Sequence, residues 1–176
     1  MKLTLELMSV GTSGHSLYRY LTTKAWTTLR QTVLEKNGSC CAVCEVTNVQ
    51  LDCNEQWEYN DETHIVRLVG LEMLCQMCHL VKHMNQRGAS LDVLAEHFMK
   101  VNECSRQAFD EYYQKCLEEQ TRREFDPYTR GPLWWEQDWG EYASLLAQEG
   151  NLKRRYQWED GLIVTVGTGN KKGKSE

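Results

Sequence analysis

Hydrophobic residues near the amino terminus follow two different spacings. Over residues 2–8, leucine alternates with polar residues, which predicts a half-buried strand. Further on, hydrophobic residues recur at helical spacing, namely Trp26, Leu29 and Val33. Thr22 or Thr23 is a suitable N-cap for this helix, and Asn-Gly at 37–38 predicts that it ends near Lys36. We expect the hydrophobic face of this helix to belong to the core.

The next stretch predicts a strand, a loop, a second strand and a helix. The first strand begins near residue 49, and the second covers residues 65–69 before Gly70, which is interpreted as a tight turn. The aromatic residues of 57–59 are expected in the loop between the strands. There they pack under the loop or, alternatively, stack on a base or a partner. The helix is expected to run from Cys78 to about residue 86.

Two more amphipathic helices follow. Ser90 is a predicted N-cap for a helix with hydrophobic residues along one side of 91–101. Ser105 is predicted to start another, with its hydrophobic side within 109–117. We expect both helices to be packing elements joined as a hairpin.

The chain changes character after residue 125. Pro127 and Gly-Pro at 131–132 break the helical pattern. Three tryptophans follow closely, Trp134, Trp135 and Trp139. We interpret them as a small satellite core, the alternative being an exposed binding surface. A helix over 141–148 and a strand over 162–166 are expected beyond them. The predicted organisation is a domain of residues 1–125, a Trp-rich extension over 126–168 and a loose basic tail over 169–176.

The charge balance of the chain bears on whether it binds nucleic acid directly. The 176 residues carry a net charge of −5 with a sequence pI near 5.6, which argues against a strong non-specific grip on nucleic acid. Local positive charge is confined to 153–155 and 171–174, where a weak phosphate contact is possible. The acidic balance equally suits docking on a basic nucleic-acid-binding protein. We find no signal peptide or membrane span and expect a cytoplasmic, intracellular protein.

The eight cysteines point to metal and not to disulfides. Two Cys-x-x-Cys pairs at this separation are typical of a structural zinc site, and no secretory signal accompanies them. The predicted ligands of one closed Zn²⁺ site are Cys41, Cys44, Cys75 and Cys78. Cys40 competes with Cys41 as a ligand, although Cys41 gives the standard spacing to Cys44. The remaining cysteines, Cys40, Cys53, Cys104 and Cys116, are expected to be buried or half-buried apolar residues.

A second ion is a further hypothesis. His79 and His83 lie four residues apart and so on one face of the predicted helix, where they are either metal ligands or plain helix-surface residues. Asp52 and Glu55 are candidate oxygen ligands of the same ion, a combination suited to Mg²⁺, Mn²⁺ or Zn²⁺. The expected nucleic-acid contacts are Lys82, Arg87 and Arg67, unless they form an ordinary solvated face.

This pattern resembles the zinc-stapled branch of the HNH endonuclease family, in particular small bacterial and phage HNH proteins. The residues that carry the resemblance are Cys53, Glu55, Trp57, Tyr59, Arg67, Leu68, Gly70, Leu71, Leu74, Cys75, Cys78, His79, Lys82 and His83. The resemblance implies an α+β chain with a ββα-metal core, flanking helices and cleavage of DNA phosphodiester bonds with one divalent ion. It covers the chain to about residue 125.

One position departs from that pattern. Asn54 stands where the family has its general-base His, and Gly70 stands roughly where the middle Asn is sought. An amide has no proton to exchange near neutral pH, so it cannot act as a general base. We therefore favour a catalytically impaired or inactive zinc module that binds DNA or a protein, for example a phage or mobile-element counter-defence protein. The alternative is an active metal-dependent HNH endonuclease.

Overall fold

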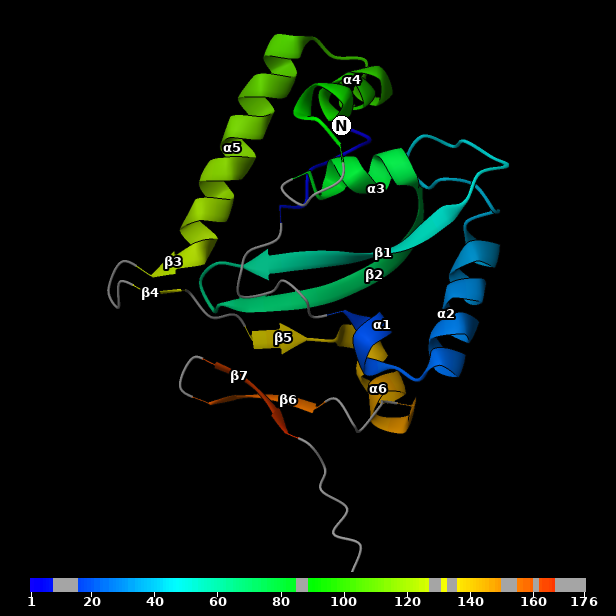
Figure 1. The fold of residues 1–176 in the computed structure, drawn as a ribbon, viewed down its shortest axis with the longest axis vertical. Coiled ribbons are helices and arrows are strands. Elements are labelled where there is room, and N and C mark those ends of the chain that lie inside the picture. The colour runs from blue at the N-terminus through cyan, green and yellow to red at the C-terminus, as the bar shows by residue number, and fades with distance from the viewer. Residues whose placement is uncertain are drawn as a thin grey trace, which may run out of the picture.

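The fold is described from a computed structural model. The structure describes residues 1–7, 16–84, 89–126, 131–132, 136–149, 155–159 and 162–166. The chain is α+β, with helices packed around a small three-stranded sheet (Figure 1).

The centre of the fold is a long antiparallel hairpin of β1 (Leu51–Asn60) and β2 (Ile65–Cys75). The short strand β5 (Glu136–Asp138) pairs in parallel with the start of β2 and completes the sheet in the order β1-β2-β5. The pairing register shifts between Gln56 and Trp57. Gly70 lies opposite Gln56, and a Cβ atom on Gly70 would come within 2.7 Å of the Gln56 side-chain oxygen.

Two expectations about this hairpin were wrong. Trp57 and Tyr59 lie within β1 and not in a loop beyond it. Gly70 lies inside β2, which continues to Cys75. A glycine in a strand often marks an irregularity where backbone or side chain approaches closely, and here the pairing continues past it.

Helix α3 (Gln76–Lys82) follows β2 directly and packs against both strands of the hairpin. It differs from the prediction at both ends: it begins two residues before Cys78, and it ends earlier than expected, with His83 as its C-cap. Residues 85–88 lie outside the described residues.

The amino-terminal residues 1–7 form no strand, although the predicted alternation is visible in their burial. The three leucines are buried, namely Leu3, Leu5 and Leu7. The backbone pairs with no neighbouring strand and is held by side chains at its start and by the backbone of Lys82 at Glu6. The Asn102 amide oxygen accepts from the N–H groups of residues 2 and 3, and its NH₂ donates to the Leu3 carbonyl. The Glu6 N–H donates to the Lys82 carbonyl, which fixes this segment against α3.

The predicted helix caps at Thr22, Ser90 and Ser105 are confirmed. Helix α1 (Leu17–Tyr20) leads into α2 (Thr23–Lys36), whose N-cap Thr22 accepts from the Ala25 N–H. Ser90 caps α4 (Leu91–Asn102) in the same way. The Ser105 hydroxyl accepts from the Ala108 N–H at the start of α5 (Arg106–Glu124). Phe98 and Phe109 meet edge to face, 5.2 Å between ring centroids, and join these two helices.

The carboxy-terminal part contains short elements. Strands β3 (Phe125–Asp126) and β4 (Gly131–Pro132) pair with each other, as do β6 (Arg155–Glu159) and β7 (Leu162–Val166). The 3₁₀ turn η1 (Gly140–Tyr142) continues into α6 (Ala143–Glu149). The helix expected over 141–148 and the strand expected over 162–166 are therefore confirmed. Trp134, Trp135, Arg87 and the tail 169–176 lie outside the described residues.

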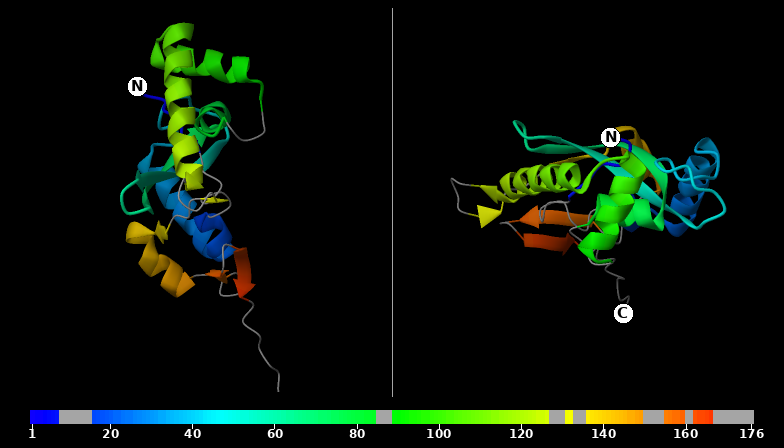
Figure 2. Two further views of the ribbon diagram at one scale, coloured as in Figure 1. Left: turned by 90° about the vertical axis from the view of Figure 1, so that its left-hand side faces the viewer. Right: turned by 90° about the horizontal axis from the view of Figure 1, so that it is seen from above.

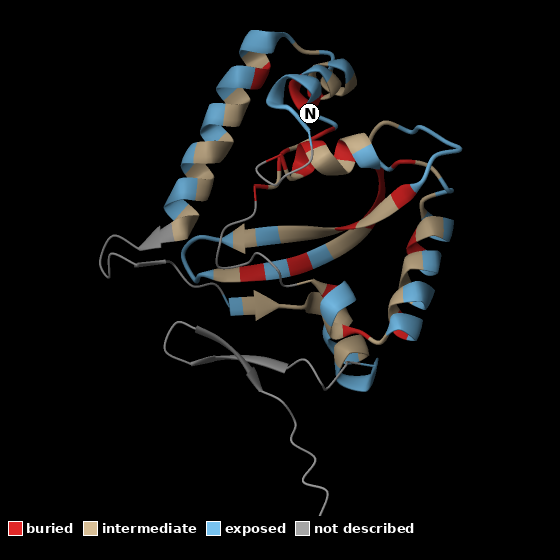
Figure 3. Ribbon diagram, viewed as in Figure 1, coloured by how far each residue is buried: buried red, intermediate tan, exposed pale blue. Residues whose placement is uncertain are grey.

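Two hydrophobic clusters stabilise the hairpin. The larger contains the amino-terminal leucines, the end of β2 and the helices α3 to α5, with Phe98, Phe109 and Met73 fully buried. Figures 1 and 2 show α4 and α5 gathered at one end of the molecule, with α1, α2 and α6 toward the other. Buried positions concentrate in the hairpin and α3 (Figure 3).

The smaller cluster contains Leu17, Leu21, Ala25 and Leu68. Trp139 packs against it, with its ring centroid 5.4 Å from that of Trp57. Trp139 thus takes the packing role expected for the tryptophans.

Candidate metal centre

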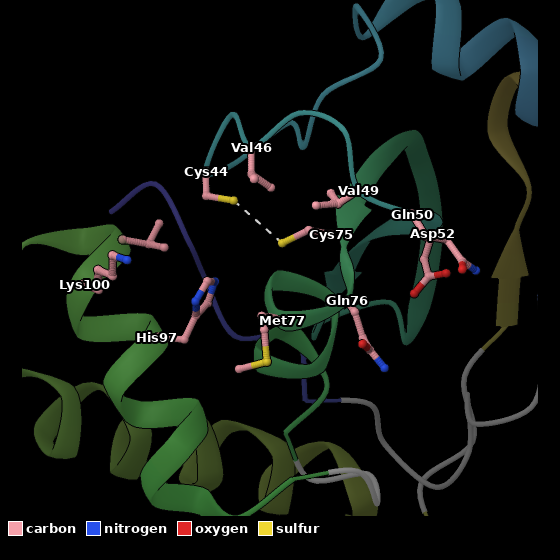
Figure 4. A pocket seen from close by; sticks show the side chains of 11 residues that line it. Cys44, Val46, Val49, Gln50, Asp52, Cys75, Gln76, Met77, His97 and Lys100 are labelled. Atoms are coloured by element: carbon pink, nitrogen blue, oxygen red, sulfur yellow. Dashed lines mark hydrogen bonds between the residues drawn. The ribbon is translucent and has the colours of Figure 1, made fainter.

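Four thiols converge at the end of the hairpin where α3 begins. The sulfur atoms of Cys41, Cys44, Cys75 and Cys78 all lie within 4.8 Å of one another. The Cys44 and Cys75 sulfurs are 3.7 Å apart (Figure 4). A tetrahedral Zn²⁺ with Zn–S distances of about 2.3 Å places its sulfurs about 3.8 Å apart, so the spacing fits this ion. The predicted four-cysteine cluster is confirmed as a group that could hold a metal ion.

The first pair of thiols comes from a tight turn over residues 41–46. The Cys41 N–H donates to the Val46 carbonyl, and the Glu45 N–H donates back to the Cys41 carbonyl. Glu45 has a φ of 60°, the left-handed conformation that closes the turn. The Ala42 N–H donates to the Met73 carbonyl and so attaches the turn to β2.

The second pair comes from the junction of β2 and α3. Cys75 is the last residue of β2 and also the N-cap of α3, where its sulfur accepts from the Cys78 N–H at 3.5 Å. A strand that turns directly into a helix brings both thiols to one side. The cluster is therefore built where three local structures meet.

Cys40 does not compete for the site. Its thiol donates to the Asn37 carbonyl at 3.2 Å, and it is not a member of the converging group. Among the described residues, the four cysteines are the one group of three or more His, Cys, Asp or Glu side chains whose ligand atoms converge.

The surroundings of the thiols act on their ionisation in opposite ways. Burial would raise the pKa of Cys41, but backbone N–H groups of Cys44, Cys75 and Val43 point at its sulfur and lower the pKa to about 7. Burial raises the pKa of Cys75, and burial with the neighbouring thiols raises that of Cys78. A bound cation would lower the pKa of the coordinating thiols, including those that burial raises, because a thiol that coordinates a metal ion is deprotonated.

His97 on α4 is a neighbour of the cluster that the sequence did not reveal. Its Nε2 atom lies 3.2 Å from the Cys78 sulfur. Burial lowers the pKa of His97, which favours the neutral ring, and an N–H at Nε2 can donate to a coordinated thiolate. His97 lies on a helix remote in sequence from both Cys-x-x-Cys pairs, so their spacing carries no signal for it.

Two residues expected at a second ion do come together. The His79 Nδ1 atom lies 3.2 Å from an Asp52 carboxylate oxygen, with the two side chains 33% and 42% exposed. The ring of His83 lies beside that of His79, 5.2 Å between centroids.

Asn54 and His83 belong to a buried polar network instead of an open site. The His83 Nε2 atom lies 2.9 Å from the Asn54 amide oxygen, and its Nδ1 lies 3.0 Å from the Glu6 carbonyl. The Asn54 NH₂ donates to the Glu72 carboxylate at 3.1 Å and lies 3.3 Å from that of Glu6. Asn54 is only 2% exposed, so its amide is fully engaged inside the protein. Burial lowers the pKa of His83.

The structure does not place Lys82 where a nucleic-acid contact requires it. Its side chain is 5% exposed and forms ion pairs with Glu6 and with Glu72, the latter at 2.9 Å. Burial alone would lower the pKa of Lys82, but the two carboxylates outweigh burial and raise it. Arg67 is exposed and pairs with Asp138 at 3.1 Å.

Glu55 is also separated from the other candidate ligands. Successive strand residues point to opposite faces, and Glu55 faces α1, whereas Asp52 and Asn54 face α3. One Glu55 oxygen accepts from the Leu17 N–H at 2.6 Å and the other from the Trp57 indole N–H at 3.2 Å. Burial raises the pKa of Glu55 to about 7, although both hydrogen bonds lower it.

Comparisons of the chain with protein-family models, with curated proteins and with solved structures found no match. In the part of the chain that the structure describes, no helix has the length and apolar character needed to cross a membrane.

Removing one thiol tests the metal centre. We expect Cys44→Ser to lose most of its bound zinc and to unfold at a lower temperature, because a structural site needs all four ligands. Cys40→Ser is the matched control and should keep one zinc per chain, since its thiol points to Asn37. Metal content and thermal unfolding measure both effects. Equal zinc content in the two variants would contradict the assignment.

Glu55 predicts a pH-dependent stability. Its folded pKa of about 7 lies above the ordinary 4.5, so its stabilising contribution is complete below about pH 4.5 and is lost as pH rises through 7. Glu55→Gln removes this ionisation. We expect the free energy of unfolding of this variant, relative to the native protein, to increase by about 1.4 kcal/mol between pH 6 and pH 8.5, because most of the total effect of about 3 kcal/mol is already lost below pH 6. Urea unfolding across this range measures the difference, with exposed Glu58→Gln as control. Parallel pH profiles would show that Glu55 does not carry the effect.

Proposed function

We propose that this protein is a zinc-stapled module of HNH-nuclease type that has lost cleavage and acts by binding. Its partner is DNA or, favoured by the net charge of −5, a protein complex that itself binds nucleic acid. The proposal places it in the cytoplasm, where thiols stay reduced and free to hold metal. The main support for the loss of cleavage is that the Asn54 side chain is buried and hydrogen-bonded to His83 and Glu72.

The order of elements supports the nuclease-like scaffold. Two antiparallel strands, β1 and β2, are followed directly by α3, which packs on them. The four thiols join the turn over 41–46 to the junction of β2 and α3. A site with four protein sulfurs has no open coordination position, so zinc here would stabilise the fold and would not activate water.

The position of the missing base supports the loss of chemistry. A general base must reach the proton it removes and must exchange it near the working pH. Asn54 is 2% exposed, and its amide contacts His83 and Glu72. It therefore has neither a suitable proton nor access to a substrate water.

One observation favours the alternative, an active metal-dependent endonuclease. Asp52 and His79 lie 3.2 Å apart and are both partly exposed. The carboxylate suits Mg²⁺ or Mn²⁺, which prefer oxygen ligands, and the imidazole suits Zn²⁺. If an ion binds there, it would supply charge stabilisation for a phosphodiester, and Asp52 and His79 would hold it.

A nicking assay separates the two functions. Supercoiled plasmid is incubated with the native chain, His79→Ala and Asn54→His, each with Mg²⁺, Mn²⁺ or Ni²⁺. We expect no nicking by the native chain above the His79→Ala background, because loss of a general base costs on the order of 10²- to 10⁴-fold in rate. Nicking by the native chain that disappears in His79→Ala would overturn the proposal. Cleavage by Asn54→His alone would support it, by showing a scaffold that lacks only its base.

A further inference from the structure

The four thiols of the metal centre differ in access to solvent. Cys41 and Cys78 are 0% exposed, Cys75 is 7% exposed, and Cys44 is partly exposed. Cys44 and Cys75 line a hollow of about 620 Å³ beside the cluster, whereas Cys41 and Cys78 do not (Figure 4). A small molecule in solution therefore reaches the cluster through Cys44 and Cys75.

The wall of this hollow is largely apolar. Val46 and Val49 stand at its edge and are 38% and 45% exposed. Met77 and Val101 line it further, with His97 and Lys100 from α4. An uncharged reagent as small as hydrogen peroxide can enter such a space without a charge penalty.

The same two thiols are close enough to react with each other. Their sulfurs are 3.7 Å apart, and a disulfide of about 2.05 Å requires them to approach by less than about 2 Å. Cys44 lies in the turn over 41–46, and Cys75 lies at the junction of β2 and α3. A bond between them would link the two halves of the metal site.

We propose that Cys44 and Cys75 are an oxidation site, at which a peroxide converts the two thiolates into a disulfide and releases the metal. The inference rests on the proposed zinc binding and adds a regulation of that site. Without two of its four sulfurs, the site no longer completes a tetrahedron. The disulfide joins the segments that the metal joined, so the turn stays attached to β2 after the metal leaves.

The reaction balances with hydrogen peroxide as the oxidant. The Cys44 thiolate attacks one peroxide oxygen, so that an S–O bond forms, the O–O bond breaks and hydroxide leaves. The Cys75 thiolate then attacks the Cys44 sulfur, an S–S bond forms and the second hydroxide leaves. The two thiolates lose two electrons in total, the peroxide gains two, and two protons from solvent convert the hydroxides to water.

Closing the hollow tests the proposal without touching a ligand. Val49→Trp places a large side chain at the edge of the hollow, and Val69→Trp is the matched control on β2, where Val69 is 52% exposed. The zinc-loaded full chains are treated with hydrogen peroxide, and zinc release is followed with a coloured chelator. We expect Val49→Trp to release zinc at least about threefold more slowly than the native chain and Val69→Trp, since oxidation follows thiol exposure. Peptide mapping by mass spectrometry then identifies the disulfide.

The outcomes separate this inference from the zinc assignment. A Cys44–Cys75 disulfide together with slowed release in Val49→Trp supports the oxidation site. A disulfide within one Cys-x-x-Cys pair, or equal release rates in Val49→Trp and Val69→Trp, overturns it. Zinc that stays bound under peroxide also overturns it while leaving the metal assignment intact. Absence of zinc before peroxide is added removes the proposed metal centre itself.

Discussion

The convergence of four thiols on one point is the constraint on which the other features depend. It requires that β1 and β2 pair up to Cys75, that α3 starts without a loop, and that the turn over 41–46 lies against Met73. Structural zinc binding contributes about 10–16 kcal/mol in small zinc domains, whereas a whole domain is stable by about 5–15 kcal/mol. Zinc bound at this junction would therefore contribute an amount comparable with the total stability of the fold.

Beside this junction, the interior of the protein contains charge. Lys82 is buried between Glu6 and Glu72, and Asn54 and His83 complete the network. Removing one partner from such a network typically costs about 3–5 kcal/mol, because it leaves a buried charge uncompensated. Glu6 belongs to the amino-terminal segment, so the network attaches that segment to the hairpin and to α3. Asn54, His83 and Lys82, three of the residues expected to serve chemistry or nucleic-acid contact, are thus used inside the protein for attachment.

Local signals in the sequence predicted the features that local physics determines. The side chains of Thr22, Ser90 and Ser105 cap their helices, and the two Cys-x-x-Cys pairs converge. A helix cap needs only a few neighbouring residues. The two Cys-x-x-Cys pairs, in contrast, meet across a separation of 31 residues between Cys44 and Cys75, and they were predictable because four thiols at this spacing are typical of a zinc site.

The wrong expectations came from features that depend on distant partners. Gly70 is a common turn residue, and its position inside β2 becomes clear only from its pairing opposite Gln56. The burial of Lys82 depends on Glu6, which lies far away in sequence. Asp52 and Glu55 are predicted ligands of one ion, but they lie three residues apart on one strand and so point to opposite faces, a separation that the predicted strand already implied. His97 reaches Cys78 through the packing of α4.

X-ray absorption at the zinc edge of the purified full chain tests the central claim most directly. The account predicts one zinc per chain with a first shell of four sulfurs at about 2.3 Å. A shell containing nitrogen or oxygen, or no stoichiometric metal, would contradict it.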